Sequence, residues 1–171
     1  CQVFEYNSGT DSWSQLGSDI DGEATGDYSA LVVDLNSDGT IVAIGAYAND
    51  GNGDAAGHVR VYEYSGGSWS QLGSDIDGSH AAEYSGKSVG LNGDGTILAV
   101  SAHSYDTNGT NRGAARVYKY SSGSWTQMGS DIQNSDTSLQ FFSLNLEINT
   151  AGDVLMAESA NTSTPGSGVI Q

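Results

Sequence analysis

A ten-residue segment that returns at a fixed spacing constrains the fold more than any other feature of the chain. The segment that starts at Trp13 is repeated without change from Trp69 and in altered form from Trp125, so the three tryptophans are 56 residues apart. A fixed period of this length is typical of tandem arrays in which each copy is one small structural unit. We therefore expect one repeat domain over residues 1–171, with units at approximately 3–58, 59–114 and 115–171.

Each unit is predicted to contain four short strands and no helix. In the second copy, residues 88–91, 96–102, 115–120 and 125–132 have the alternating or β-branched apolar patterns of strands. The segment 92–95, between the first two predicted strands, contains Asn-Gly and Asp-Gly, which tolerate the positive φ of a tight hairpin turn. No stretch of the chain has a long apolar pattern of helical period. The predicted fold class is all-β.

The repetition favours a β-propeller-like array of four-stranded antiparallel blades. A small sheet cannot bury both faces by itself, and stacking against neighbouring sheets buries them. We expect Trp13, Trp69 and Trp125 to pack between blades rather than to stack on a ligand. The chain starts on the third strand of one blade and stops where the third strand of another should begin. Three units are fewer than the four to eight of a closed propeller. We therefore expect part of a larger propeller, an oligomeric ring or a fibre subunit, with self-assembly through open blade edges.

The charge of the chain excludes some partners. With 21 acidic and 5 basic residues, the formal net charge is −16, and the basic residues are scattered rather than clustered. Phosphate backbones need clustered Lys and Arg, so nucleic acid is not expected as a partner. The longest apolar stretch, Ile41–Ala48, is too short to cross a bilayer, so no transmembrane segment is expected. The acidity fits either a well-solvated surface or the attraction of cations.

Two segments of the second copy carry a family resemblance. Residues 85–102 follow the pattern Ser-Gly-x-Ser-Val-x-Leu-x-x-Asp-Gly-Thr-x-Leu-Ala-Val-x-Ala, and residues 113–120 follow Gly-Ala-x-x-Val-Tyr-x-Tyr. Together they resemble the FG-GAP repeat, found in integrin α-chain propellers and in surface proteins of marine microbes and algae. The resemblance covers essentially the whole chain and implies a β-propeller fold. The Phe-Gly dipeptide of the family is replaced in each copy, by Ser29-Ala30, Ser85-Gly86 and Phe142-Ser143.

Integrin-type members of this family bind calcium, and the resemblance implies a weak Ca²⁺ candidate in the first copy, at Asp34, Asn36 and Asp38. Oxygen ligands at alternate positions around a Gly turn suit Ca²⁺, but the closing acid of the family loop is missing here. A second candidate has the same alternation and consists of Asp50, Asn52 and Asp54. A plain hairpin turn and a solvated loop are the respective alternatives.

The sequence offers no constellation for catalysis, so we do not expect an enzyme. No Gly-x-Ser-x-Gly elbow occurs, and His58, His80 and His103 lie at different phases of the repeat without metal-ligand spacing. Arg60 and Arg116 recur with the period, and we expect both to face outward. The carboxylate pairs also recur and are assigned to the scaffold: Asp19 with Asp21, and Asp75 with Asp77. A glycan-active hydrolase remains a remote alternative.

Two sequons predict N-glycosylation, at Asn108 and Asn161, if the chain is secreted by a eukaryote. Cys1 is either a lipid-bearing first residue or, as the repeat alignment favours, part of a strand in a longer protein. We expect an extracellular or cell-surface, non-enzymatic binding or adhesion module. Its protein or glycan ligand would contact the long loops Tyr47–His58 and His103–Arg112. The alternative is a structural subunit of an extracellular filament or surface coat.

Overall fold

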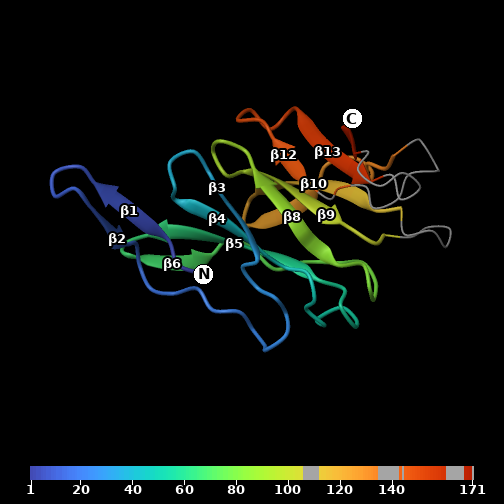
Figure 1. Ribbon diagram of the computed structural model, residues 1–171, viewed down its shortest axis with the longest axis horizontal. Helices are drawn as coiled ribbons and strands as arrows, with labels where there is room; N and C mark the ends of the chain where they lie inside the picture. Colours follow the sequence, from blue (N-terminus) through green and yellow to red (C-terminus); the bar gives the residue numbers. More distant parts are fainter. Residues whose placement is uncertain (106–111, 135–142, 144, 161–167, 171) are drawn as a thin grey trace.

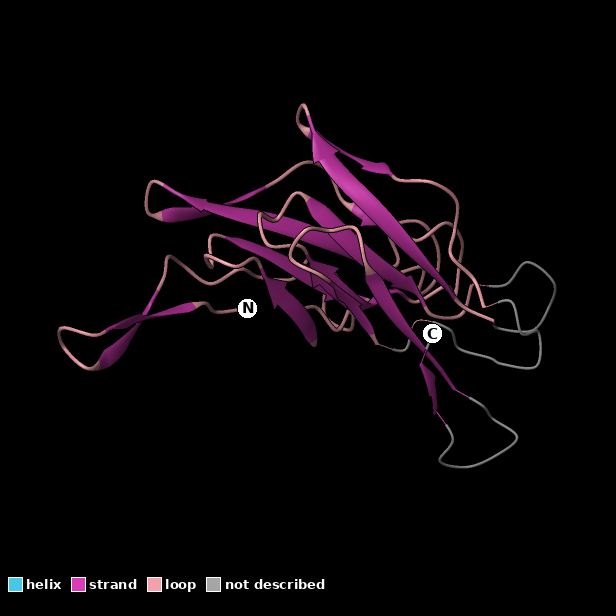
Figure 2. Ribbon diagram, turned by 90° about the horizontal axis from the view of Figure 1, so that it is seen from above, coloured by secondary structure: helices cyan, strands magenta, loops and turns pink. Residues whose placement is uncertain are grey.

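The computed structural model describes residues 1–105, 112–134, 143, 145–160 and 168–170, and this part of the chain contains strands and turns but no helix (Figures 1 and 2). The pairings between the named strands are all antiparallel. The predicted all-β class is therefore confirmed for the described residues.

The strands group into three sheets and one separate hairpin. In chain order they are β1 (Phe4–Asn7), β2 (Ser12–Gln15), β3 (Val32–Leu35), β4 (Ile41–Ala46), β5 (His58–Ser65), β6 (Ser68–Gln71), β7 (Ile76–Asp77), β8 (Ser85–Leu91), β9 (Ile97–Ala102), β10 (Ala114–Ser121), β11 (Ser124–Gln127), β12 (Leu146–Ile148), β13 (Leu155–Ala160) and β14 (Gly168–Ile170). The N-terminal hairpin is β1–β2. The first sheet has the order β3-β4-β5-β6 with β7 on β5, the second β8-β9-β10-β11, and the third β12-β13-β14.

The first and second sheets have the same path and the same register. Ile41 on β4 faces Glu63 on β5, and Ile97 on β9 faces Lys119 on β10. All six residues of β4 are buried, as are the last five of β9. An apolar run without polar interruptions suits a strand that is covered on both faces.

The fourth strand is shorter than its predicted span of residues 125–132. Strand β11 ends at Gln127, and of the residues beyond it only Ile132 forms a bridge, with Ala115. The chain turns at Gly129, which has a φ of 71° that glycine adopts without strain. This turn breaks the ladder before Ile132 returns to it.

An asparagine fixes the tight turn between the first two strands of each sheet. The side-chain oxygen of Asn36 accepts hydrogen bonds from the backbone N–H groups of Thr40 and Ile41, both at 2.9 Å. Asn92 accepts in the same way from Ile97, and Asn149 accepts from three consecutive backbone N–H groups. Such local bonds explain why the Asn-x-Asp-Gly sequence forms a hairpin here.

The main core lies between the first and second sheets. It combines Ile41, Val59 and Val61 of the first sheet with Leu98 and Val100 of the second, among others. Leu98 is fully buried, so its truncation to alanine should destabilise the fold by about 2–5 kcal/mol. A smaller cluster, which includes Ala99 and Leu146, joins the second sheet to the third.

At Gly45 and Gly86 the backbones of the first two sheets approach each other too closely for a side chain. A side-chain carbon at Gly45 would collide with the carbonyl oxygen of Gly86, and one at Gly86 would meet the carbonyl oxygen of His58. Gly86 has a φ of 81°, and its counterparts Ala30 and Ser143 also have positive values, 66° and 69°. The position held by glycine in the family dipeptide is therefore left-handed in all three copies.

The repeated tryptophan contacts the sheet before its own. The indole N–H of Trp69 donates to the carbonyl oxygen of Leu16 at 2.7 Å, and that of Trp125 donates to the carbonyl oxygen of Leu72 at 2.8 Å. Each indole also covers the glycine that follows the leucine, Gly17 or Gly73. Trp13 has no such partner in the described part of the chain and is 68% exposed. The recurring Trp-x-x-Leu-Gly segment thus links one sheet to the next.

The sheets form an open array with incomplete sheets at opposite ends. The N-terminal hairpin lies at one end, and β12 and β13 lie at the other (Figures 1 and 2). The hairpin corresponds to the third and fourth strands of a complete sheet, whereas β12 and β13 correspond to the first and second.

Candidate functional site

The long loop of the first sheet is fixed against the second sheet. Residues 47–57 connect β4 to β5, and the carbonyl oxygens of Asp54, Ala55 and Ala56 accept hydrogen bonds from the backbone of residues 82, 84 and 85. Gly57 also forms a parallel bridge with Ser85. A loop anchored in this way presents its side chains from a fixed backbone, as recognition loops on rigid scaffolds do.

Three tyrosines lie close together, on the anchored loop and on the segments that precede β3 and β8. The rings of Tyr28 and Tyr47 stack with centroids 5.3 Å apart and an interplanar angle of 4°, and Tyr84 lies beside Tyr47 at 6.3 Å. The ammonium group of Lys87 lies 5.9 Å from the centre of the Tyr47 ring. Tyr28 is 56% exposed, so one face of the cluster is open to solvent. Tyrosine combines apolar area with a polar hydroxyl, which suits it to binding surfaces.

Two of these tyrosines have an unusual backbone. Tyr28 and Tyr84 occupy the same position of the repeat, and their φ values are 54° and 55°. A bulky residue in this left-handed region is rare and costs about 1–2 kcal/mol. Such strain is typical of positions where the side chain is held for a purpose. We name Tyr28, Tyr47 and Tyr84 the tyrosine cluster.

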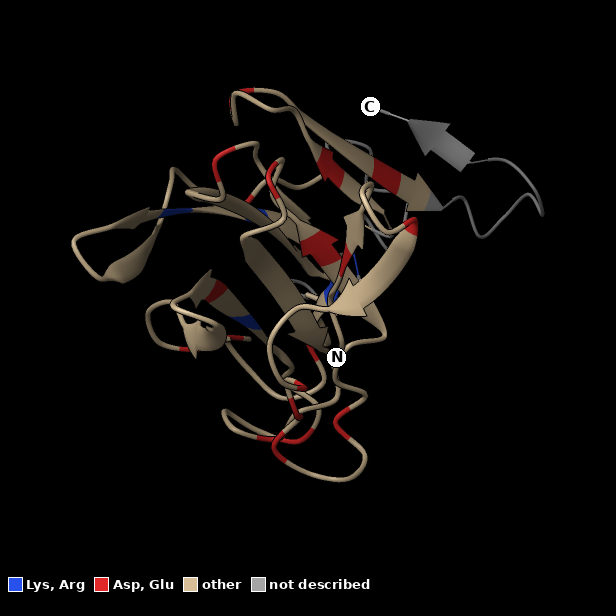
Figure 3. Ribbon diagram, turned by 90° about the vertical axis from the view of Figure 1, so that its left-hand side faces the viewer, with Lys and Arg blue, Asp and Glu red and all other residues tan. Residues whose placement is uncertain are grey.

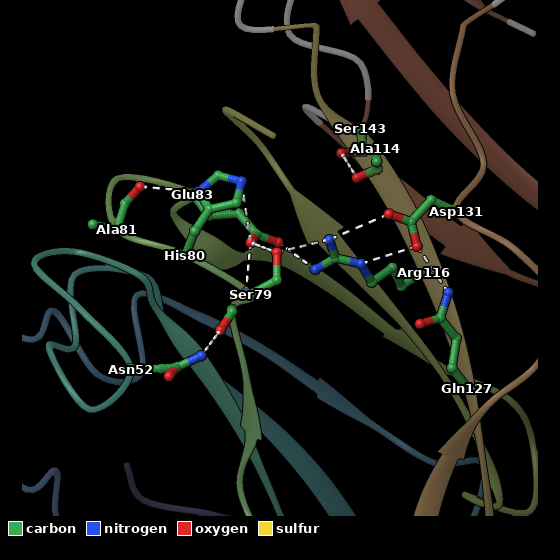
Figure 4. A network of polar contacts seen from close by, with 11 residues as sticks. Asn52, Ser79, His80, Ala81, Glu83, Ala114, Arg116, Gln127, Asp131 and Ser143 are labelled. Carbon is green, nitrogen blue, oxygen red and sulfur yellow. Dashed lines mark hydrogen bonds and ion pairs between the residues drawn. The ribbon is translucent and has the colours of Figure 1, made fainter. Parts of the chain in front are cut away.

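The arginines that were expected to face outward lie in ion pairs instead, with Arg116 buried and Arg60 16% exposed, so that prediction is wrong. The Arg116 side chain is 7% exposed and lies between Asp131 and the fully buried Glu83 (Figure 4). Arg60 lies in the same way between Asp75 and Glu23. The arginines recur because each neutralises acids that come from two different segments, which a solvent-facing position would not require.

The pKa values of these groups follow from their pairing. Burial alone would raise the pKa of Asp131, but hydrogen bonds from Arg116 and Gln127 outweigh it and hold that pKa below its usual value. The pKa of Asp75 is lowered in the same way by hydrogen bonds from Arg60 and Gln71. Burial alone would lower the pKa of Arg116, but Asp131 and Glu83 outweigh it and raise that pKa. These groups therefore stay charged at neutral pH and hold adjacent segments together.

Glu23, His58 and Asp75 form a cluster of groups that could hold a metal ion, which the sequence did not suggest. The Nδ1 atom of the buried His58 lies 3.9 Å from Glu23 and 3.8 Å from Asp75. Burial, with the Arg60 charge second, lowers the pKa of His58. Because Arg60 already pairs with both carboxylates, the cluster is satisfied as an ion-pair network.

The first calcium candidate lies in the tight turn between β3 and β4. Asp34 accepts hydrogen bonds from the backbone N–H groups of Leu35 at 2.9 Å and Leu91 at 2.7 Å. Asp38 accepts a hydrogen bond from the hydroxyl of Thr40 at 2.5 Å. This bond is the main reason why the pKa of Asp38 is lowered. The Asn36 oxygen is bound to two backbone N–H groups, as described above. An ion at this turn would have to compete with these bonds.

The second calcium candidate lies in the anchored loop, and its three residues have different partners. Asp50 accepts from the backbone N–H of Ala55 at 2.8 Å, and the Asn52 amide donates to the carbonyl oxygen of Gly78 at 2.6 Å. The Asp54 side chain is exposed. Calcium binding at either place stays a prediction.

Other predicted positions are only partly visible. Asn108 and Asn161, the sequon residues, lie outside the described residues, as do residues 106–111 of the second long loop. At the start of that loop, Tyr105 stacks on His80 with centroids 5.6 Å apart, and its ring lies 4.8 Å from the Arg116 guanidinium. Cys1 precedes β1 and belongs to none of the named strands, and its backbone exchanges hydrogen bonds with Ile20.

Two equivalent clefts lie beside the repeated tryptophans, one between the first and second sheets and one between the first sheet and the segment after the N-terminal hairpin. One of about 310 Å³ is lined by Trp125, Tyr118 and residues 74–77, and one of about 260 Å³ by Trp69, Tyr62 and residues 18–21. Because the two clefts are equivalent under the repeat, they belong to the packing of neighbouring sheets. The tyrosine cluster is not part of either cleft.

No protein-family model matches the chain, and no curated protein matches it. The FG-GAP resemblance therefore stays a prediction. Among the described residues, no helix has the length and apolar character needed to cross a membrane. Acidic residues are distributed over many loops and strands, whereas Lys and Arg are few (Figure 3).

Proposed function

We propose that this chain is an extracellular or cell-surface, non-enzymatic binding or adhesion module of the FG-GAP, β-propeller type. Its four-stranded sheets would be blades, and its ligand surface would lie on the loops that carry the tyrosine cluster. The ligand class is a protein or a glycan. The observation that carries the proposal is the stacked pair of Tyr28, which is 56% exposed, and Tyr47, which begins the anchored loop.

Tyrosine faces supply a large contact area at a low cost in side-chain entropy, and aromatic side chains often dominate the free energy of binding. The anchored backbone adds to this, because a surface that is ordered before binding loses less entropy when it binds. The strained Tyr28 and Tyr84 fit a surface selected for what it presents rather than for stability.

Binding to a glycan microarray and to immobilised extracellular-matrix proteins tests this proposal. Tyr28→Ala and Tyr47→Ala should each weaken binding at least about tenfold, which corresponds to the 1.4 kcal/mol or more expected of a central aromatic contact. Val154→Ala is the control, because Val154 is similarly exposed, at 61%, on the distant β12–β13 turn. Unchanged binding by both tyrosine variants would reject the surface. Turnover of chromogenic glycosides would instead favour the hydrolase alternative.

A second candidate function is a structural subunit of an extracellular filament or coat. The observation that favours it is the pair of incomplete sheets at the two ends of the array (Figure 1). Negative-stain microscopy distinguishes the two functions, because a filament or coat protein should form fibres or lattices and a binding module should form discrete particles.

A further inference from the structure

The imidazole of His58 is buried beside three carboxylates and forms no hydrogen bond in the described part of the chain. The residue is 3% exposed. Its Nδ1 atom lies 3.9 Å from Glu23, 3.8 Å from Asp75 and 4.0 Å from Asp77. These separations are longer than a hydrogen bond, which joins two heavy atoms at about 2.7–3.2 Å. Buried polar groups normally have a partner, and none of the three acids is close enough to be the partner of this ring.

The register of the first sheet brings these groups to one point. His58 pairs with Asp77 across β5 and β7, and directly opposed residues of a sheet have their side chains on the same face. Arg60 follows His58 by two residues on β5 and shares that face, where it donates to Asp75 at 3.0 and 3.1 Å. Glu23 comes to the same point from the segment between β2 and β3. One ligand atom each of Glu23, His58 and Asp75 lies within 4.8 Å of the other two.

The ion pairs of Arg60 satisfy Glu23 and Asp75 but leave the imidazole without a hydrogen bond. Arg60 contacts Oε1 of Glu23, whereas Oε2 of that carboxylate lies toward His58 and accepts a hydrogen bond of 3.3 Å from the Asn49 amide. With Asp77 included, three carboxylates and one guanidinium leave two negative charges at this point. Burial lowers the pKa of His58, so the ring is neutral at neutral pH and adds no positive charge. A divalent cation would balance the two charges, and the neutral imidazole is the form that binds metals.

The second sheet lacks this arrangement at the equivalent place, although it keeps the ion pairs. Arg116 lies there between two acids, as its counterpart does in the first sheet. Ala114 stands in the position of His58, and Gln133 in the position of Asp77. The ion pairs of the repeat therefore need neither the histidine nor the third acid. Both of these additions to the first sheet bring a side chain that can bind metal to the same point.

A single Zn²⁺ ion fits these separations. Zn²⁺ binds imidazole nitrogen and carboxylate oxygen at about 2.1 Å, so two of its ligand atoms can be at most about 4.2 Å apart. The distances from Nδ1 of His58 to Glu23 and Asp75, 3.9 and 3.8 Å, lie within this limit. The Glu23 side chain is 45% exposed, so it has room to move closer when an ion binds. Ca²⁺ and Mg²⁺ take oxygen ligands, and the imidazole therefore favours a transition metal of the Zn²⁺ kind.

We propose that Glu23, His58 and Asp75 bind one divalent transition-metal ion of the Zn²⁺ kind, and that this ion ties the segment between β2 and β3 to the first sheet. Asp77 adds negative charge beside the ion. Arg60 orients the two ligating carboxylates by its hydrogen bonds, as outer groups of metal sites do. The site shares no residue with either calcium candidate or with the tyrosine cluster, so the inference is independent of ligand binding there.

Isothermal titration calorimetry with ZnCl₂, on protein stripped with EDTA and then freed of it, tests the site. Millimolar Mg²⁺ is kept present to occupy oxygen-only sites on this acidic chain. The wild type should bind one Zn²⁺, and His58→Ala, which introduces the residue of the second sheet, should raise the Kd at least about tenfold, as should Glu23→Gln. His80→Ala is the matched control. Nε2 of His80 also lies 3.8 Å from a carboxylate, that of Glu83, but the described residues add no third ligand there.

Thermal unfolding gives a second measure of the same site. Bound Zn²⁺ should raise the melting temperature of the wild type and of His80→Ala, but not that of His58→Ala. Circular dichroism spectra identical to wild type would show that the variants fold. A zinc affinity that is unchanged in His58→Ala and in Glu23→Gln, or that falls equally in His80→Ala, would overturn the proposal. A water molecule would then be the partner of the imidazole.

NMR of the imidazole nitrogens identifies the ligand atom in the wild-type protein. The signals of His58 are those missing from the spectrum of His58→Ala. One equivalent of Zn²⁺ should shift Nδ1 of His58 most strongly, because that atom faces the carboxylates. Shifts confined to His80 or His103, or no shift of any histidine, would contradict the proposed site.

Discussion

The contact of Trp125 with Gly73 offers a direct measure of how neighbouring sheets hold together. A side-chain carbon at Gly73 would lie 2.9 Å from Cδ1 of Trp125, which is too close without a shift of the indole. Gly73 also has a φ of 79°, so alanine there is strained whatever the space. Gly39 has a similar φ of 73° with nothing within 4 Å, which makes Gly39→Ala a matched control for backbone strain alone.

The expected magnitudes follow from these two effects. Gly39→Ala should lower the free energy of unfolding by about 1 kcal/mol, the lower end of the left-handed penalty. Gly73→Ala adds overpacking, which typically costs about 1–3 kcal/mol more. When Trp125→Ala is already present, the additional loss at Gly73 should vanish, because the atom that it meets is gone. The excess is therefore a coupling energy between the two residues.

Urea unfolding followed by far-UV circular dichroism measures these losses. All variants are compared with the wild type at the same protein concentration. Equal losses for Gly73→Ala and Gly39→Ala would refute the reasoning, as would an excess at Gly73 that persists without Trp125.

Further predictions concern the buried charges, pH and calcium. Glu83→Gln leaves the buried Arg116 with one fewer negative partner and should lower the free energy of unfolding by about 3 kcal/mol. Glu23→Gln, at the more exposed Arg60 pair, should lower it by at most about 1 kcal/mol in the same urea assay. Burial, followed by the charge of Lys87, lowers the pKa of His103 to about 4. The unfolded chain therefore binds this proton at higher pH than the folded chain, and stability should decline as pH falls from about 6.5 to about 4. His103→Gln should flatten that decline. If the loop of Asp50, Asn52 and Asp54 binds Ca²⁺, millimolar Ca²⁺ should raise the melting temperature of the wild type but not of Asp54→Asn, and a melting temperature insensitive to both Ca²⁺ and chelator would dismiss the site.

The strand pattern could be predicted because it depends on local sequence. The apolar run 97–102 and the Asn-Gly and Asp-Gly turn before it determine a buried strand and a hairpin without information from elsewhere. The early end of β11 was missed because the φ of a glycine cannot be inferred from residue type. Gly129 turns the chain with a positive φ, whereas Gly90 continues strand β8 without one.

The ion pairs of Arg60 and Arg116 with Glu23 and Glu83 could not be predicted from the repeat. Arg60 and Arg116 are equivalent, but their partners Glu23 and Glu83 are not, because they lie 60 rather than 56 residues apart. Each reaches its arginine from a long loop, whose path depends on packing between sheets. The tyrosine cluster left a partial signal, since Tyr28 and Tyr84 share a repeat position, but the counterpart of Tyr47 is His103.

Hydrogen exchange of the three indole N–H groups, resolved by NMR, tests the stacking of the repeats most directly. The account predicts slow exchange for Trp69 and Trp125, whose N–H groups bond to Leu16 and Leu72, and fast exchange for Trp13, which is 68% exposed. Fast exchange at Trp69 and Trp125, or exchange at Trp13 that is as slow as theirs, would contradict it.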